Sequence, residues 1–148
     1  MNNETVTVTL EDGYYTTALS RQHTWHADIR EASGGEDRAP TPEELVMGTL
    51  GSCMAQTAKL YAARKGWQVD KIEVALSFER FPGKDYPGYE GEAAFVHEIR
   101  EHVIIEGPLD DDQKRRIREI MTRCPVRRMI ANPAFFVEAA ADAGNIRK

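Results

Sequence analysis

The chain has 148 residues, of which 41% are hydrophobic and 29% are charged, and this composition is typical of one globular domain with a buried core. Its formal charge of -5 at pH 7 argues against binding to a nucleic acid backbone or to an anionic membrane surface. No segment approaches the roughly 20 apolar residues that cross a bilayer, and no signal peptide is evident, so we expect a single cytoplasmic domain, residues 1–148.

The N-terminal segment has the pattern of a β-hairpin. Threonines alternate with apolar residues over residues 5–10, and the turn dipeptide Asp12-Gly13 follows. We therefore predict two antiparallel strands within residues 5–19. A third strand is predicted over residues 23–30, before a loop rich in glycine and charged residues.

A long helix is predicted after this loop, because its start carries several N-terminal signals. Thr41 is a favourable N-cap, Pro42 suits the first helical position, and Glu44 completes a capping box. Gly66 predicts that the helix stops at about residue 65. At ~1.5 Å per residue the helix extends roughly 37 Å, which is comparable with the diameter of the whole domain.

Most of the circumference of this helix is apolar or small. The residues concerned are Leu45, Val46, Met47, Gly48, Leu50, Gly51, Met54, Ala55, Ala58, Leu60, Tyr61 and Ala62. A helix that is apolar on most sides must be covered on most sides. One chain with a single further long helix has little with which to cover it, so we predict a homodimer in which these helices are buried centrally.

The second half of the chain again places strands before helices. Alternating apolar residues predict strands over residues 69–81 and 95–106, joined by a loop over residues 82–91 that is rich in proline and glycine. The second strand places Phe95, His97, Ile99, Val103 and Ile105 on one face. These two strands are expected to supply a second apolar surface for the helices.

Helix-start signals follow twice more. Asp110 and Gln113 form a capping box, and Cys124-Pro125 opens another helical turn. A final short strand is predicted over residues 135–139. Strands and helices in this order argue for an α+β fold with antiparallel sheets rather than a parallel βαβ sheet.

The two cysteines are the main candidates for chemistry. Cys53 lies inside the long helix, where a thiol is by default a small hydrophobic residue. Cys124 lies at a helix start, where unpaired N–H groups favour an anion, so we expect its pKa to be lowered. Each cysteine taken alone is more often inert than catalytic. No zinc-ligand spacing, Walker motif or dinucleotide fingerprint is present, so no metal and no cofactor are expected.

Two sequence motifs favour a catalytic role for the two cysteines. Residues 42–45 have the pattern P-E-x-L ten residues before Cys53, and the tripeptide Cys124-Pro125-Val126 lies far downstream. In this combination the chain resembles the OsmC/Ohr family of thiol-dependent peroxidases. The resemblance implies antiparallel sheets wrapped around long central helices in an intertwined homodimer.

The resemblance also implies a reaction and the roles of the two thiols. Cys53 corresponds to the peroxidatic cysteine, which reduces an organic hydroperoxide and becomes a sulfenic acid, and Cys124 corresponds to the resolving cysteine, which condenses with it to form a disulfide. A dithiol or lipoyl-type reductant then reopens the disulfide. This cycle requires the two Cα atoms to lie within about 7 Å of each other.

A glutamate and an arginine complete the site that the resemblance implies. Glu43 matches the family glutamate that orients the hydroperoxide together with an arginine, for which Arg30 is the main candidate and Arg38 and Arg21 are lesser ones. Glu43 lies ~15 Å along the helix from Cys53, so it could serve the thiol of a partner chain packed antiparallel. Alternatively, Glu43 only favours the helix dipole and the arginines are solvated charges.

Two functions are compatible with these residues. The first is a peroxidase that acts on organic hydroperoxides through Cys53 and Cys124, in oxidative stress defence. The second is a non-enzymatic stress or small-molecule-binding protein of the same fold, whose thiols sense redox state without turnover. Arg127, which follows Cys-Pro-Val where many relatives carry histidine, either supplies positive charge near Cys124 or faces solvent.

Overall fold

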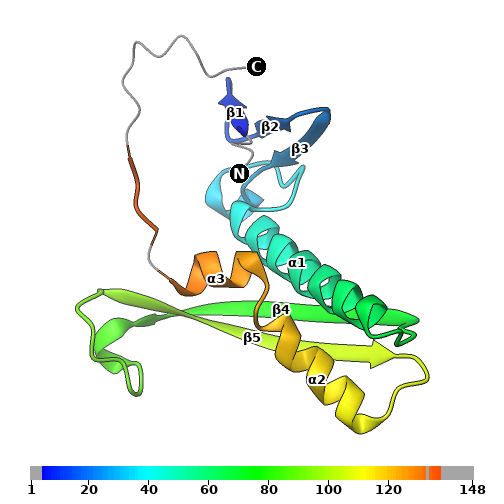
Figure 1. Ribbon diagram of the computed structural model, residues 1–148. Coiled ribbons are helices and arrows are strands. Elements are labelled where there is room, and N and C mark those ends of the chain that lie inside the picture. The colour runs from blue at the N-terminus through cyan, green and yellow to red at the C-terminus, as the bar shows by residue number, and fades with distance from the viewer. Residues whose placement is uncertain (1–4, 133, 138–148) are drawn as a thin grey trace. The chain divides into compact units, whose positions relative to one another are not determined.

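The computed structural model describes residues 5–132 and 134–137 of the chain (Figure 1). These residues form two compact units. The first unit comprises residues 5–46 and 134–137, and the second comprises residues 47–132. Both units combine helices with antiparallel strands, which confirms the predicted α+β class.

The first unit contains a three-stranded antiparallel sheet in the order β1-β2-β3. Its strands are β1 (Thr7–Leu10), β2 (Thr16–Ser20) and β3 (His23–Ala27). Gly13 has a φ of +62° in the turn between β1 and β2, a conformation that glycine adopts without strain. The predicted hairpin and third strand are therefore confirmed, although β3 ends earlier than expected.

A buried carboxylate explains why β3 ends at Ala27. Asp28 is only 2% exposed, and its side chain accepts hydrogen bonds from the backbone N–H groups of Ile29 (2.8 Å) and Arg38 (3.1 Å). These bonds, that of Arg38 above all, hold the pKa of Asp28 below its usual range. The chain therefore turns at Asp28 into a short 3-10 helix, Glu31–Ser33, instead of continuing as a strand.

Helix α1 (Pro42–Arg64) has the predicted start and stop. The Thr41 hydroxyl accepts a hydrogen bond from the Glu44 N–H (3.3 Å), and the Glu44 carboxylate accepts one from the Thr41 N–H (2.9 Å), which completes the capping box. Gly66 follows the helix with a φ of +69°. Within the chain, α1 buries a single stripe of residues spaced four apart, namely Leu50, Met54, Ala58 and Ala62.

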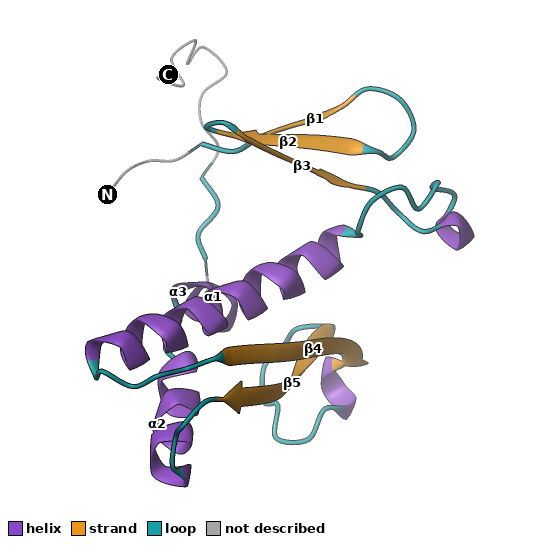
Figure 2. Cartoon of the chain, turned by 90° about the vertical axis from the view of Figure 1, so that its right-hand side faces the viewer, coloured by secondary structure: helices purple, strands orange, loops and turns teal. Residues whose placement is uncertain are grey.

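In the second unit, α1 lies along a long antiparallel hairpin (Figure 2). The hairpin consists of β4 (Lys71–Pro82) and β5 (Phe95–Glu106). Its inner face carries apolar pairs such as Ile72 with Ile105, which pack against the core. Its outer face is charged, with Lys71 bonded to Glu73 and Glu106. The alternation predicted from the sequence therefore separates a core face from a solvent face.

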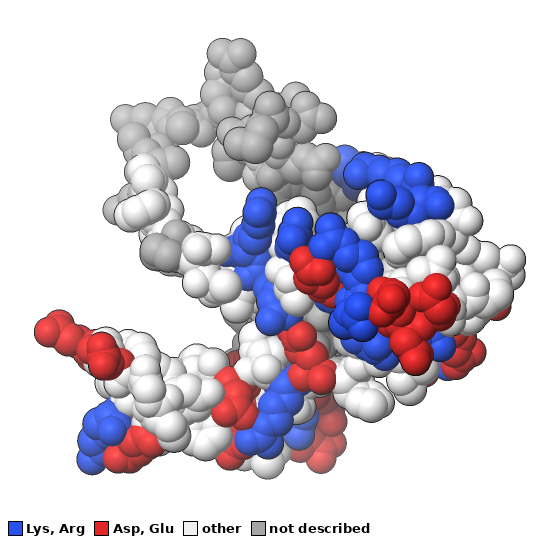
Figure 3. Space-filling view, turned by 60° about the horizontal axis from the view of Figure 1, so that its bottom comes forward, with Lys and Arg blue, Asp and Glu red and all other residues white. Residues whose placement is uncertain are grey.

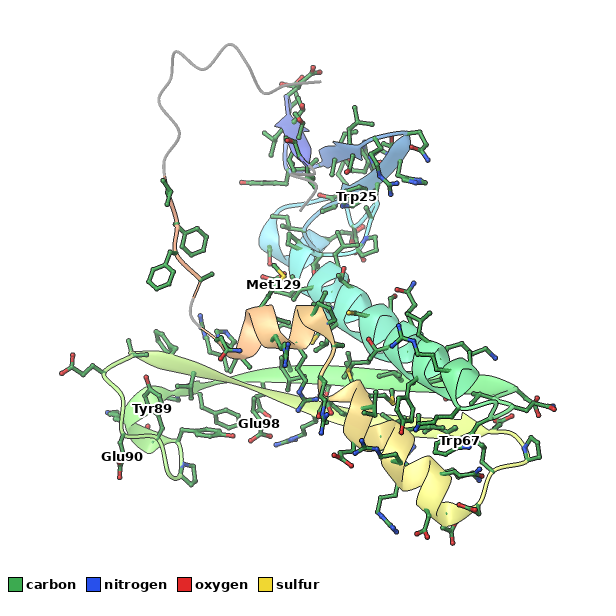
Figure 4. The ribbon with its side chains drawn as sticks, in the orientation of Figure 1. Trp25, Trp67, Tyr89, Glu90, Glu98 and Met129 are labelled. Carbon is green, nitrogen blue, oxygen red and sulfur yellow. The ribbon has the colours of Figure 1, made fainter. Side chains whose placement is uncertain are left out.

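Two helices complete the second unit. Helix α2 (Asp111–Met121) starts at the predicted Asp110 capping box and buries Ile117 and Met121. Ion pairs join Arg115 to Asp112 and Arg116 to Glu119 on its exposed side, and Figure 3 shows basic and acidic side chains next to one another on the surface. Helix α3 (Pro125–Ala131) has Cys124 as its N-cap. Met129 lies on the exposed side of α3 (Figure 4).

The predicted final strand over residues 135–139 is wrong where the structure describes it. Residues 135–137 belong to no strand, and residues 138 and 139 lie outside the described residues. Phe135, Phe136 and Val137 are 91%, 99% and 89% exposed. An apolar run forms a strand only where a neighbouring strand supplies hydrogen-bond partners, and β-propensity alone does not supply them.

Among the described helices, none is long and apolar enough to cross a membrane.

The register of β5 generates a testable prediction, because adjacent isoleucines face opposite sides. Ile105 is 4% exposed in the core, whereas Ile104 is 37% exposed on the outer face. We expect Ile105→Ala to lower the free energy of unfolding by about 2–5 kcal/mol through lost burial and an internal cavity. The matched change Ile104→Ala should cost no more than about 1 kcal/mol. Urea denaturation followed by circular dichroism measures both, and equal losses would contradict the register.

Candidate active site

The second unit brings the two cysteines together. Both are free thiols, and Cys53 packs against the core cluster that contains Cys124. The two thiols lie close enough for Cys53 to affect the pKa of Cys124. The spatial proximity that the sequence only implied is therefore present within one chain, between α1 and the start of α3.

Helix α1 determines how far Cys53 is exposed. Leu50 and Met54 belong to the buried stripe of this helix and are each 1% exposed. Cys53 lies between them in the sequence, about 100° around the helix axis from Met54, and is therefore at the edge of the stripe. Its side chain is half-buried, so solvent reaches it in part.

Cys124, at the start of α3, is more deeply buried than Cys53. Cys124 is fully buried, at 0% exposure, next to Met121 at the end of α2. Pro125 occupies the first turn of α3, and the Cys124 sulfur accepts a hydrogen bond from the Arg127 N–H at 3.3 Å. A thiol therefore takes the place that a serine or aspartate usually has at a helix N-cap.

The pKa of Cys124 is raised, so the lowered value expected from its place at a helix start is wrong. Burial is the largest cause, because it disfavours the charged thiolate, and the neighbouring Cys53 side chain raises the pKa further. The backbone N–H groups of Arg127 and Val126 oppose this rise. Desolvation outweighs these hydrogen bonds, so Cys124 carries its proton at neutral pH.

An ion pair lies beside Cys124. The Arg127 guanidinium donates to the Glu101 carboxylate of β5, and these side chains are 35% and 24% exposed. The pKa of Arg127 is raised, first by its hydrogen bond to Glu101 and also by the negative charge that Cys124 carries when it ionises. Arg127 therefore supplies positive charge near the thiol rather than facing solvent alone.

Glu101 is the residue that the sequence analysis missed. It lies on the inner face of β5, where its cross-strand partner is Leu76. The apolar alternation of this strand has a gap at Glu101, between Ile99 and Val103. That gap was a usable signal, because a carboxylate on an apolar face requires a partner.

The expected arginine lies in the first unit and binds a neighbour of the expected glutamate. Arg30 forms an ion pair with Glu44 at 2.7 Å, in addition to the capping contacts of Glu44. The pKa of Glu44 is lowered, first by the Thr41 N–H and then by Arg30. Within residues 5–132 and 134–137, Glu43 has no ion pair or side-chain hydrogen bond. Arg30 is thus fixed at the start of α1, one residue from Glu43.

The lesser candidates also belong to the first unit. Arg38 stacks on the Tyr15 ring at 4.1 Å and pairs with Glu36 at 3.0 Å. Arg21 has a φ of 53° in the turn between β2 and β3. A hollow of about 260 Å3 is lined by residues of the first unit, including Arg38 and Asp28, and by neither cysteine.

A metal-binding group of three or more His, Cys, Asp or Glu side chains does not occur in the part of the chain that the structure describes. The chemistry that the described geometry supports belongs to the thiols themselves. Two thiols in contact can lose two electrons and two protons to form a disulfide. The raised pKa of Cys124 and the partial exposure of Cys53 make the two sulfurs chemically unequal.

A family model matches most of the chain. The model describes an OsmC-like protein and matches residues 34–138. This range runs from the loop before α1 to a point beyond α3 and includes both cysteines. Among curated proteins, none matches the chain.

Solved structures show the same fold. An OsmC-like protein from Mycoplasma pneumoniae has a TM-score of 0.70 and 22% identity, with 88% of this chain and 89% of that chain covered. The organic hydroperoxide resistance protein OsmC from Legionella pneumophila has a TM-score of 0.65 at 14% identity, with 88% and 90% covered. The organic hydroperoxide resistance protein OhrB of Bacillus subtilis has a TM-score of 0.59 at 14% identity, with 85% and 88% covered.

The raised pKa of Cys124 predicts a loss of stability at alkaline pH. The folded state binds the Cys124 proton more tightly than the unfolded state, so this contribution is complete below the unfolded pKa of about 8.5 and is lost as pH rises through the folded pKa. We expect the free energy of unfolding to fall as the pH rises above about 8.5. Urea denaturation across this range should show a weaker fall for Cys124→Ser, and parallel curves for the two proteins would contradict the prediction.

Proposed function

The chain belongs to the family of OsmC-like proteins, and from this premise we propose that it reduces organic hydroperoxides through a cycle of Cys53 and Cys124. One observation carries the proposal, namely the packing of Cys53 against the core cluster that contains Cys124. The fold shared with proteins named organic hydroperoxide resistance proteins supports the substrate class.

The proposed reaction consumes one hydroperoxide and two thiols. The Cys53 thiolate attacks the terminal peroxide oxygen, the O–O bond breaks, and the alkoxide leaves as the alcohol after taking a proton. Cys53 is then a sulfenic acid. Cys124 attacks its sulfur, the S–O bond breaks, and water leaves with the proton that Cys124 loses. A dithiol or lipoyl-type compound reduces the resulting disulfide by two electrons.

The structure supports Cys53 rather than Cys124 as the thiol that meets the peroxide. Cys53 is half-buried, whereas Cys124 is fully buried and has a raised pKa. A hydroperoxide approaching from solvent meets the exposed sulfur first. Access and protonation together assign the first step to Cys53 and the second to Cys124.

We also propose that Glu43 and Arg30 orient the hydroperoxide. Arg30 forms an ion pair with Glu44 at the start of α1, and Glu44 is the residue that directly follows Glu43. Since ten residues of helix separate Glu43 from Cys53 by about 15 Å, these groups act on the thiol of a partner chain. The proposal therefore includes a homodimer, and a single domain over residues 1–148, because the family match extends across both units.

The chemistry of the proposed cycle suits a reducing compartment. The cytoplasm keeps thiols reduced, and the cycle needs an external dithiol to restart it. We therefore propose a cytoplasmic protein whose physiological partner is a dithiol or lipoyl-type reductant. Neither nucleic acid nor a membrane has a part in this cycle.

One observation favours a second function. The Arg30 guanidinium binds Glu44, which also caps α1, so its charge is already in part engaged. If Arg30 is not released toward substrate, the thiols lack the cation that orients a hydroperoxide. The chain is then a redox-sensing or small-molecule-binding stress protein, in which the same disulfide forms without turnover.

Peroxidase assays distinguish the two functions. We expect the protein to consume cumene hydroperoxide with dihydrolipoate as reductant, and Cys53→Ser to lower this rate by at least about 100-fold because it removes the nucleophile. Cys124→Ser should accumulate a sulfenic acid on Cys53 that dimedone traps. Absence of turnover in the unsubstituted protein with several dithiols would contradict the peroxidase function and favour the redox-sensing function.

The proposed dimer makes a separate prediction about α1. Gly48 is exposed, and nothing in the chain lies within 4 Å of a Cβ added there. A leucine at this position therefore has room in one chain, and its cost arises only where a second helix approaches. We expect Gly48→Leu to weaken dimerisation and Gly48→Ala to weaken it far less. Light scattering over a concentration series measures both, with circular dichroism as the control for folding, and an unchanged Gly48→Leu dimer contradicts the packing.

A further inference from the structure

The inner face of β5 carries a carboxylate, that of Glu101, which has no role in the proposed thiol cycle. Glu101 stands among apolar residues on this face, opposite Leu76 of β4, with its side chain 24% exposed. A carboxylate that loses water in this way costs free energy unless it has a partner. Glu101 therefore needs a partner on this inner face, and Arg127 is that partner.

Arg127 joins this carboxylate to the thiol site. Its guanidinium donates to Glu101, and its backbone N–H donates to the Cys124 sulfur at 3.3 Å. The same residue thus holds the N-cap sulfur with its main chain and the carboxylate with its side chain. The guanidinium also lies close enough to Cys124 for their charges to interact.

We propose that Arg127, positioned by Glu101, stabilises negative charge on the Cys124 sulfur while the Cys53–Cys124 disulfide closes and reopens. In turnover this inference depends on the proposed peroxidase cycle, but the effect on the thiol itself does not. Arg127 is the charge-stabilising residue, and Glu101 is a positioning residue that acts through it.

The chemistry places an anion on Cys124 in both directions. To close the disulfide, Cys124 loses its proton and its sulfur attacks the Cys53 sulfenic sulfur, from which hydroxide leaves and is protonated to water. To reopen it, a dithiol thiolate attacks the Cys53 sulfur, the S–S bond breaks, and Cys124 leaves as a thiolate. A nearby cation lowers the energy of both transition states.

Among the described residues, the groups around Cys124 come from three elements. Helix α1 contributes Cys53, α3 contributes Arg127, and β5 contributes Glu101 through its ion pair with Arg127. Arg123, which immediately precedes Cys124, is paired with Glu119 of α2 at 3.0 Å. The acidity of Cys124 therefore depends on two opposite charges, of which Arg127 favours the thiolate and Glu101 disfavours it.

This arrangement predicts shifts of opposite sign for the two members of the ion pair. In a Cys53→Ser background Cys124 is the sole thiol, and the 13Cβ chemical shift of labelled cysteine follows its titration by NMR. Arg127→Gln should raise the midpoint by about one pH unit, because the thiolate loses its cation. Glu101→Gln should lower the midpoint, because the amide oxygen keeps Arg127 in place without a negative charge.

Two controls separate charge from structure. Arg128→Gln makes the same change one residue further along α3, where the side chain is exposed, and should leave the midpoint unchanged. Arg127→Lys retains the charge and should largely restore the midpoint of the unsubstituted residue. If Arg127→Gln does not fold, the lowered midpoint expected for Glu101→Gln still tests the inference.

A kinetic measurement tests the consequence for disulfide closure without any peroxide. Saturating diamide forms an adduct on one thiol, which the other thiolate displaces as the disulfide closes and the diamide is reduced to a hydrazine. With both cysteines present at pH 7.5, Arg127→Gln should slow closure about threefold, because a shift of one unit lowers the thiolate fraction about tenfold while the more basic thiolate attacks about threefold faster. Arg128→Gln should leave the rate unchanged.

Shifts of the same sign for Arg127→Gln and Glu101→Gln, or an equal shift for Arg128→Gln, would overturn the inference. These outcomes are independent of the peroxidase assay. Failure to turn over hydroperoxide with the opposite shifts intact removes the proposed function and leaves the charge pair. Turnover without the shifts retains the function and removes the role of Arg127.

Discussion

The site depends on the burial of Cys124 at the junction of α2 and α3. Ile117 and Met121 anchor α2 in the core, and the chain then turns directly into Cys124. The stripe of α1 that contains Leu50 and Met54 packs into the same cluster, which carries Cys53 to the edge of that cluster. Core packing, rather than a dedicated loop, therefore sets the distance between the sulfurs. Because packed interiors deform little, the thiols remain paired in the reduced protein.

Burial has an electrostatic consequence that the helix start alone does not predict. Backbone N–H groups at the start of α3 favour a thiolate, but desolvation of a fully buried sulfur is the larger effect and the pKa rises. The Glu101–Arg127 pair adds a cation whose charge is partly cancelled by its own partner. Such a pair stabilises an anion during reaction without imposing a permanent thiolate in the resting protein.

Local sequence signals predict much of this structure, but they do not predict contacts between residues that are far apart in the sequence. The capping boxes at Thr41 and Asp110 fix the starts of α1 and α2, because their hydrogen bonds involve residues three apart. Proximity of Cys53 and Cys124 followed only from resemblance to a family, since no local rule joins positions so distant. The Glu101–Arg127 pair had a signal, the gap in the β5 alternation, but its partner could not be identified from spacing. The strand expected at residues 135–137 illustrates the same limit, because strand pairing depends on a neighbour.

The unequal exposure of the two sulfurs matters for the proposed cycle. Cys124 is buried and Cys53 is half-buried, so in that cycle both the oxidant and the reductant meet Cys53. The proposed part of the buried sulfur is to attack or to leave as an anion. Its acidity therefore affects the rate of both half-reactions, while the choice of substrate depends on what surrounds Cys53. In the proposed cycle, a substitution near Cys124 would change the rate of disulfide chemistry, and a substitution near Cys53 would change which hydroperoxide is bound. The two properties can therefore change independently.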